Sequence, residues 1–206
     1  MKRESYSVLR VPSTSDGEFR VVKDTLHIYL LRRAETLQGV AGYALYQPTI
    51  TYWNGRKHKE SSFPMSVRFD DGQLELWATT WNQSPDSESL LERARHAHAE
   101  HMGATYRLFT SADFYRNPIA TQNRDSIHAY LACWYKTDTA ALERQLLAAL
   151  STAVDASIRE LAAAVAHRDN DVQVAVYRLL VKGQLTGDLE TSRVSPDWRV
   201  RRTNHA

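Results

Sequence analysis

Histidine and cysteine side chains are the first residues in this sequence that could hold a metal ion. His96, His98 and His101 lie close together in a segment with helical periodicity. On a helix His98 and His101 share one side while His96 points elsewhere, so three zinc ligands do not converge. The single cysteine, Cys133, excludes an internal disulfide, and its apolar surroundings AYLACWY predict a packed core thiol. From these residues we predict no metal site.

Carboxylates offer a second chemistry, because hydrolysis of a phosphodiester with Mg²⁺ needs hard oxygen ligands and a polarised water. Asp70, Asp71 and Glu75 lie around a turn in the stretch SSFPMSVRFDDGQLELWATTW, residues 61–81. The alternation of apolar residues in this stretch predicts two strands, and the dipeptide DG predicts a tight turn between them. Asp70 and Asp71 are therefore better explained as turn formers than as metal ligands.

Composition narrows the classes of protein. A hydrophobic content of 43% and a charged content of 24% are those of an ordinary globular protein. A net charge of +2 is too small to identify a polyanion-binding protein, so any such function must rest on local patches. The sequence has no 18-residue apolar run and no apolar leader segment, so we expect a cytoplasmic protein with no membrane partner.

The first two thirds of the chain alternate between helical and strand patterns. Residues 1–18 predict a flexible arm, and residues 19–138 predict one α/β domain with a mixed sheet. The expected elements are a helix at 19–37, a strand at 44–53, a basic loop at 54–60, the hairpin at 61–81, a turn at 82–85, a helix at 86–103, a strand at 104–110, a helical turn at 111–115 and a helix at 123–135.

The remaining residues, 139–206, predict a separate domain. Three helices are expected at 139–150, 155–166 and 171–183, with Asp155 as the cap of the second, followed by a two-stranded hairpin over 184–202. Three short helices and a basic hairpin describe a winged helix-turn-helix.

In such a domain the last helix enters the major groove and the wing contacts the adjacent backbone. We therefore expect DNA contacts from Gln173, Arg178, Lys182, Arg199, Arg201 and Arg202. Several phosphate contacts would make binding steeply dependent on salt. Many winged helices bind protein, so docking against a partner protein remains an alternative.

Four segments, taken in order, resemble a known family. They are the strand YQPTITY, the hairpin FPMSVRFDDGQLELW, the segment ERARHAHAEHMGATYRLFTSADF and the winged tail. Together they resemble TnsA, the restriction-endonuclease-like subunit of heteromeric transposases. The resemblance implies a restriction-endonuclease-like mixed-sheet core followed by a winged helix. It also implies three partners: DNA, a transposase and an ATPase regulator of the same mobile element.

The resemblance further implies a catalytic metal site, but the residue types do not match it. The family's acidic residues and lysine fall near Ile28, Pro64, Ala78 and Thr80, and none of these can ligate a divalent metal. The carboxylates of the hairpin turn lie at the opposite end of both strands, roughly 20 Å away at about 3.3 Å per residue. We therefore expect a pseudo-nuclease that binds DNA or partner proteins in a transposition complex, without a cofactor.

Two alternatives remain open. In the first, Glu60 and a helix carboxylate, Asp24 or Glu35, form a relocated Mg²⁺ site, with Lys57 or Lys59 in place of the missing lysine. The protein would then be a divergent metal-dependent DNA endonuclease acting in transposon excision. In the second, the winged helix binds an operator and the protein is a regulator. The sequence does not indicate the DNA site, the oligomeric state or the identity of the partners.

Overall fold

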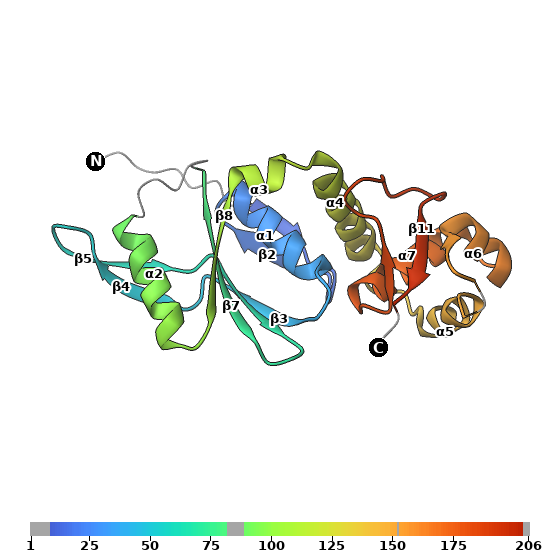
Figure 1. Ribbon diagram of the computed structural model, residues 1–206, viewed down its shortest axis with the longest axis horizontal. Coiled ribbons are helices and arrows are strands. Elements are labelled where there is room, and N and C mark those ends of the chain that lie inside the picture. The colour runs from blue at the N-terminus through green and yellow to red at the C-terminus, as the bar shows by residue number, and fades with distance from the viewer. Residues whose placement is uncertain (1–8, 82–88, 152, 204–206) are drawn as a thin grey trace. The chain divides into compact units, whose positions relative to one another are not determined.

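The computed structural model describes residues 9–81, 89–151 and 153–203 (Figure 1). Its residues form two compact units. Unit 1 consists of Met1–Val11, Val21–Ala34 and Gly39–Arg116, and unit 2 of Pro12–Arg20, Glu35–Gln38 and Asn117–Ala206. The described residues contain seven α-helices and a multi-stranded mixed sheet, which confirms the predicted α/β class. α4, which the sequence places in the first domain, belongs to unit 2.

Unit 1 is built on a four-stranded mixed sheet. Its strands are, in spatial order, β3 (Val40–Leu45), β6 (Met65–Phe69), β7 (Leu74–Thr80) and β8 (Thr105–Thr110). β3, β6 and β7 are antiparallel neighbours, whereas β8 runs parallel to β7. The helices along this part of the chain are α1 (Thr25–Thr36) before β3, α2 (Leu90–His101) between β7 and β8, and α3 (Ser111–Tyr115) after β8.

The β6–β7 hairpin confirms the prediction for residues 61–81. Gly72 adopts a φ of 86°, a conformation that favours glycine, and Asp71 accepts a hydrogen bond from the Gln73 amide at 2.9 Å. Side chains from both faces of β7 are buried, as expected for a central strand. The predicted turn at 82–85 lies outside the described residues.

The N-terminal part of the chain differs from the prediction. Part of the expected arm is a strand, β1 (Leu9–Pro12), which pairs with β2 (Phe19–Val22). The helix expected from residue 19 therefore begins only at Thr25. The β-branched pair at positions 21 and 22 favours a strand. The Asp24 side chain then accepts a hydrogen bond from the Leu26 amide at 2.7 Å, which stabilises the start of α1.

The segment expected to be a strand and a basic loop is instead a two-stranded β-ribbon. β4 (Thr49–Trp53) pairs with β5 (His58–Ser62), and only residues 54–57 form the turn. Tyr46, at φ 58°, separates this ribbon from β3. We call Thr49–Ser62 the ribbon. Figure 1 shows it beside α2, and Ile50 packs there against Ala99 in a small apolar cluster.

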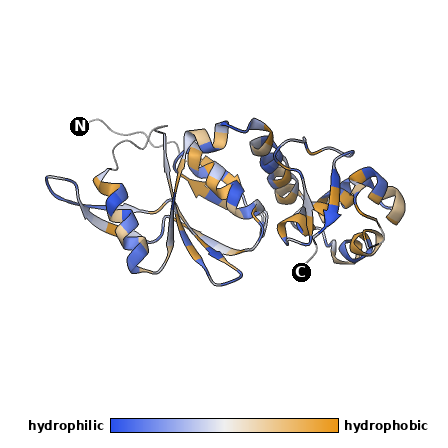
Figure 2. Ribbon diagram, in the orientation of Figure 1, coloured by the Kyte–Doolittle hydropathy of each residue, from blue (hydrophilic) through white to orange (hydrophobic). Residues whose placement is uncertain are grey.

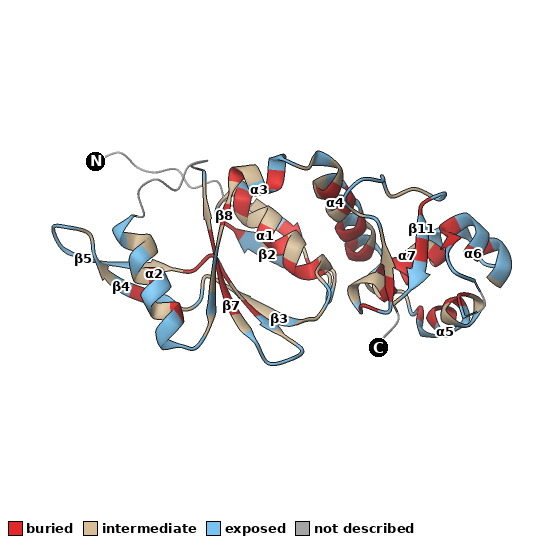
Figure 3. Cartoon of the chain, in the orientation of Figure 1, coloured by how far each residue is buried: buried red, intermediate tan, exposed pale blue. Residues whose placement is uncertain are grey.

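Unit 2 combines four helices with a small antiparallel sheet. The elements are α4 (Pro118–Cys133), α5 (Ala140–Ala149), β9 (Ala156–Ser157), α6 (Ile158–Val165), α7 (Asp169–Val181), β10 (Leu185–Gly187) and β11 (Arg199–Arg202). The strands lie in the order β10-β11-β9. The core packs around α7, where Tyr177 and five other residues are buried (Figure 3). The helices expected at 139–150, 155–166 and 171–183 are confirmed within a few residues.

Two local predictions in unit 2 are wrong. Ser157, not Asp155, caps α6: its hydroxyl accepts from the Glu160 amide at 3.1 Å, while the Glu160 carboxylate accepts from the Ser157 amide at 2.8 Å. The Cys133 thiol, expected in the core, is exposed at the last residue of α4, because its apolar sequence neighbours occupy the buried face. Among the described residues, no helix has the length and apolar character needed to cross a membrane.

Candidate functional site

A pocket of about 690 Å³ lies in unit 1, where β6 begins and β7 ends. Segments far apart in the sequence contribute to it: the start of α1, the residue after β3, the base of the ribbon, and α2. Its lining comprises Lys23, Asp24, His27, Tyr46, Thr49, Glu60, Ser61, Ser62, Pro64, Thr79 and Arg95. Two cations, two acids and five hydroxyl groups thus face one cavity.

The positions that the family resemblance assigns to a metal site lie in or next to this pocket. Pro64 and Thr79 line it, and Thr79 lies between Ala78 and Thr80 on β7. His27 lines it as well, one residue before Ile28. Of the four positions, only Pro64 itself is in the lining; Ile28, Ala78 and Thr80 adjoin lining residues along the chain.

Tyr46 contacts Lys23 and His27, two residues near the start of α1. Its hydroxyl accepts a hydrogen bond from the Lys23 amide at 2.6 Å, and its oxygen lies 3.2 Å from His27 Nδ1. The Lys23 ammonium lies 4.3 Å from the centre of the Tyr46 ring, in cation–π contact. The lysine, histidine and tyrosine thus form one contiguous group.

Burial favours the neutral forms of Tyr46 and His27. It raises the pKa of the Tyr46 hydroxyl, with a smaller opposing effect from the Lys23 amide. Burial also lowers the pKa of His27 below 6.5, although the nearby Asp24 carboxylate acts in the opposite direction. At neutral pH the imidazole is therefore uncharged and can both donate and accept a hydrogen bond.

Arg95 brings a buried positive charge to the pocket from α2. The residue is only 8% exposed. Its Nη2 donates to the Ser62 carbonyl at 3.0 Å and to the Ser61 hydroxyl at 3.3 Å, and its guanidinium lies 5.7 Å from the Phe63 ring centre. The Tyr106 hydroxyl also interacts with the guanidinium. Burial lowers the pKa of Arg95, but a guanidinium remains charged at neutral pH.

The acids of the pocket differ in how firmly they are held. Asp24 uses one oxygen to accept from the Leu26 amide and the other to accept from Trp81 Nε1 at 3.2 Å. Glu60 is exposed on β5, opposite Thr51. Over residues 9–81, 89–151 and 153–203, no group of three or more His, Cys, Asp or Glu side chains could hold a metal ion.

The other carboxylates considered from sequence lie elsewhere and have local partners. Glu75 is buried, accepts from Trp77 Nε1 at 2.7 Å and pairs with Arg107 at 2.8 Å. Glu35, the alternative to Asp24, belongs to unit 2 and lies 3.0 Å from His128 Nε2. Neither lines the pocket.

Sequence reasoning missed Lys23, His27, Tyr46 and Arg95 as pocket residues. A signal for Arg95 was present, because Leu91, Arg95 and Ala99 are spaced by four residues and share one face of α2. An arginine on the apolar face of a helix indicates a buried cation. The contribution of Tyr46 had no comparable signal, because it depends on a left-handed backbone conformation.

In unit 2 the cations of α7 have partners inside the unit. Arg178 donates to the Thr137 and Trp134 carbonyls and to the Thr139 hydroxyl, and Lys182 pairs with Glu143 at 2.6 Å. These side chains were expected to face outward. Arg178 instead faces the segment that joins α4 to α5, a contact that helix periodicity alone does not reveal, whereas Lys182 pairs with Glu143 of α5 and remains 53% exposed.

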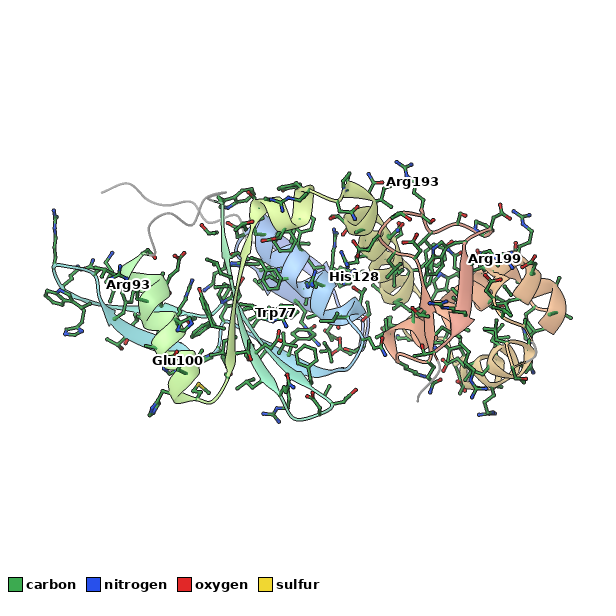
Figure 4. All side chains as sticks on the ribbon, in the orientation of Figure 1. Trp77, Arg93, Glu100, His128, Arg193 and Arg199 are labelled. Carbon is green, nitrogen blue, oxygen red and sulfur yellow. The ribbon has the colours of Figure 1, made fainter. Side chains whose placement is uncertain are left out.

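Gln173 and the arginines of β11 show a mixed pattern. Gln173 is half-buried and donates to the Tyr177 hydroxyl at 2.6 Å. Arg199 of β11, which is labelled in Figure 4, pairs with Asp155 at 2.6 Å and with Glu160 at 3.3 Å. Arg201 and Arg202 are exposed and line a second pocket, of about 990 Å³, with Thr186 and Thr203 among its other residues. Two other members of the predicted DNA-binding set, Arg178 and Lys182, line a further pocket of about 570 Å³.

The loop between β10 and β11 is fastened to α4. The buried Asn123 side chain donates to the Leu189 and Ser192 carbonyls at 2.9 and 2.7 Å and accepts from the Val194 amide at 2.9 Å. Arg124 adds an ion pair with Glu190 at 2.8 Å. One side of this loop is therefore occupied by α4, which limits what else can approach it.

A comparison with known proteins found no matching family model and no matching curated protein.

Proposed function

We propose that this protein is a DNA-binding subunit of a transposition complex, in which a nuclease-like unit holds DNA without cutting it. In unit 1 the order α1, β3, β6, β7, α2, β8, with the ribbon inserted between β3 and β6, agrees with a restriction-endonuclease-like core. In unit 2 the order of helices and antiparallel strands after residue 139 agrees with a winged helix. Both support the likeness to TnsA. A separate recombinase would then carry the strand chemistry.

The observation that carries this proposal is Arg95. Its guanidinium lines the cavity and is held in place by the Nη2 hydrogen bonds to Ser61 and Ser62, so a fixed positive charge faces any anion that enters. Guanidinium groups match phosphate geometry, since two N–H groups can donate to two oxygens of the same phosphate. We infer that the ligand is a backbone phosphate of DNA.

Other side chains of the pocket fit the same ligand. Lys23 contributes a second cation at the exposed rim, and hydroxyl groups such as those of Thr49 and Thr79 can donate to phosphate oxygens. The Asp24 carboxylate repels an anion less because its two oxygens already accept hydrogen bonds from the Leu26 amide and Trp81 Nε1.

Binding of a labelled DNA duplex, measured by fluorescence anisotropy, tests the proposal. Arg95→Gln should weaken binding by about tenfold or more, because a hydrogen bond to a charged group contributes roughly 1.5–3 kcal/mol. Lys23→Gln should weaken it less, since Lys23 is exposed. The matched control is Arg68→Gln, an exposed arginine on β6, four residues beyond Pro64 along the chain.

Thermal unfolding of each variant separates loss of binding from loss of fold. If Arg95→Gln unfolds, Lys23→Gln and Arg95→Lys provide the comparison. Unchanged affinity in folded variants of both positions would exclude the pocket as the DNA site.

A divergent DNA endonuclease is the second candidate, because Asp24 and Glu60 line the same pocket. Under this reading the two carboxylates would hold Mg²⁺, and Lys23 would take the part assigned from sequence to Lys57 or Lys59. Asp24 and Glu60 would be the two carboxylate ligands, and water and the DNA phosphate would have to complete the coordination of Mg²⁺.

Glu60→Gln distinguishes the two candidates. If the protein only binds DNA, removing this negative charge should leave affinity unchanged or tighten it. If it is an endonuclease, Mn²⁺- or Mg²⁺-dependent nicking of supercoiled DNA should be present in the wild type and lost in the variant. A calorimetric Mn²⁺ titration with and without duplex gives the same distinction when cleavage needs a partner transposase.

A further inference from the structure

The ribbon extends from the candidate pocket as a two-stranded arm. The cross-strand pairs Thr49–Ser62, Thr51–Glu60 and Trp53–His58 alternate with Ile50–Ser61 and Tyr52–Lys59. Side chains alternate between the two faces of a strand, so the first three pairs share one face. Thr49, Glu60 and Ser62 of that face also line the pocket.

The opposite face of the ribbon holds it against unit 1. Ile50 is buried in a cluster with Phe63, Leu76 and Ala99. The other face, which carries Thr49, Thr51 and Trp53, is therefore not needed for packing. Near its far end, Trp53 is 51% exposed and its ring centre lies 5.3 Å from that of His58.

The tip of the ribbon is basic and conformationally fixed. The Asn54 side chain accepts from the Arg56 and Lys57 amides at 3.1 and 2.9 Å, and Gly55 adopts a φ of 92°. This turn places Arg56 and Lys57 at the end of the ribbon, next to His58 and Lys59, and Figure 2 shows that the tip is hydrophilic.

The cations of the tip are exposed, and none of Arg56, Lys57 and Lys59 has an ion-pair partner among the residues that the structure describes. Glu60, the one acid of the ribbon, lies nearer to the pocket than to the tip. A tight turn that concentrates unpaired positive charge is suited to a polyanion.

We infer that the ribbon is a groove-binding arm that enters the major groove of duplex DNA beside the pocket. This inference rests on the proposed function. The major groove is about 12 Å wide and admits a two-stranded β-ribbon. Five residues separate Ser62 at the pocket from Lys57 at the tip, which corresponds to roughly 17 Å of extended strand. The tip therefore reaches phosphates well beyond the one held at the pocket.

The side chains along the exposed face fit this placement. Arg56 and Lys57 contact phosphates across the groove, and Thr51, Trp53 and His58 face the base edges. This face offers only a few groups able to read bases, so the ribbon contributes affinity and orientation more than sequence specificity.

The salt dependence of duplex binding tests the inference. The probe is a fluorescein-labelled linear duplex of mixed sequence, and the variant is the double substitution Arg56→Gln and Lys57→Gln. Removing two phosphate contacts should reduce the slope of log affinity against log salt by about 1.8, at about 0.9 for each contact. The control, Arg68→Gln with Arg116→Gln, removes the same charge from exposed positions elsewhere in unit 1.

Dimethyl sulfate protection of guanine N7 reports the major groove directly. The wild type should lower guanine N7 reactivity along the duplex, and the tip variant should lose that protection while residual binding persists. Circular dichroism should be unchanged, because Asn54 and Gly55 retain the turn.

Several outcomes would overturn the inference. If the wild type binds the duplex and the tip variant keeps the same slope, the ribbon makes no contact and the proposed function still stands. If the control lowers the slope equally, the effect is one of net charge. If the wild type binds no duplex, both proposals fail. Tip-dependent binding to polyglutamate without binding to DNA would assign the ribbon to an acidic protein surface.

Discussion

Tyr46 and His27 show how single residues shape the pocket. The backbone of Tyr46 has a φ of 58°, a region that costs a non-glycine residue about 1 kcal/mol or more. In this conformation the Tyr46 hydroxyl lies within hydrogen-bonding distance of both the Lys23 amide and His27 Nδ1. The strain therefore coincides with a specific arrangement of polar groups at a cavity, which is where such strain is commonly found.

The lowered pKa of His27 predicts how stability changes with pH. The unfolded chain binds a proton at His27 more readily than the folded protein, so the free energy of unfolding should fall as pH drops below about 6.5 and through the folded pKa. Above that range His27 should contribute no pH dependence.

Urea unfolding of the wild type and of His27→Gln at a series of pH values measures this effect. The variant should show a smaller loss of stability below about pH 6.5. His101→Gln, at an exposed position on α2, should behave like the wild type. Equal loss in wild type and His27→Gln would contradict the prediction.

At the scale of elements, the sequence predicts well those segments whose local signals agree with their surroundings. The β6–β7 hairpin follows from strict alternation and the turn at Gly72, and α2 begins with the capping box of Ser89 and Glu92. Most of β5, the second strand of the ribbon, was mistaken for a loop because HKESS has no apolar alternation: neither face of β5 is buried deeply.

The candidate site is less predictable than the elements that form it. Its side chains come from several separate segments of the chain, and no local pattern indicates that they meet. The direction of Arg178 could not be predicted either, since the α7 face that carries it is chosen by the 134–139 segment. Such tertiary contacts have no local sequence signal.

Capping gives a prediction at the element scale. Ser157→Ala should destabilise the protein by about 1 kcal/mol, because the Glu160 amide loses its acceptor at the start of α6. Asp155→Ala, at the position where the sequence suggests the cap, should have a smaller effect. Chemical denaturation followed by far-ultraviolet circular dichroism compares them, and the reverse order would show that the cap is assigned to the wrong residue.

At the scale of the whole molecule, the two compact units do not follow the chain in simple succession. Unit 2 includes Pro12–Arg20 and Glu35–Gln38 as well as everything after Asn117. Glu35 is buried against His128 of α4 and accepts from the Thr14 amide at 2.8 Å. These early segments are thus part of the packing of unit 2.

Glu35→Ala should therefore destabilise unit 2, although position 35 lies far from it in the sequence. Removing one partner of a buried polar pair typically costs about 3 kcal/mol. Hydrogen exchange should become faster for the amides of α4 than in the control Glu18→Ala, an exposed glutamate of the same unit. Unchanged protection of α4 would show that the early segments are dispensable.

The interleaving of the two units also limits how this protein can be recombined. A single crossover in the segment after residue 116 would carry α4–α7 into a hybrid protein without Glu35 or the hydrogen-bond donor of Thr14. The transferred unit would then contain His128 buried beside a vacancy. Exchange of the C-terminal unit between such proteins thus requires either two further crossovers near the N-terminus or a recipient that already has equivalent residues there.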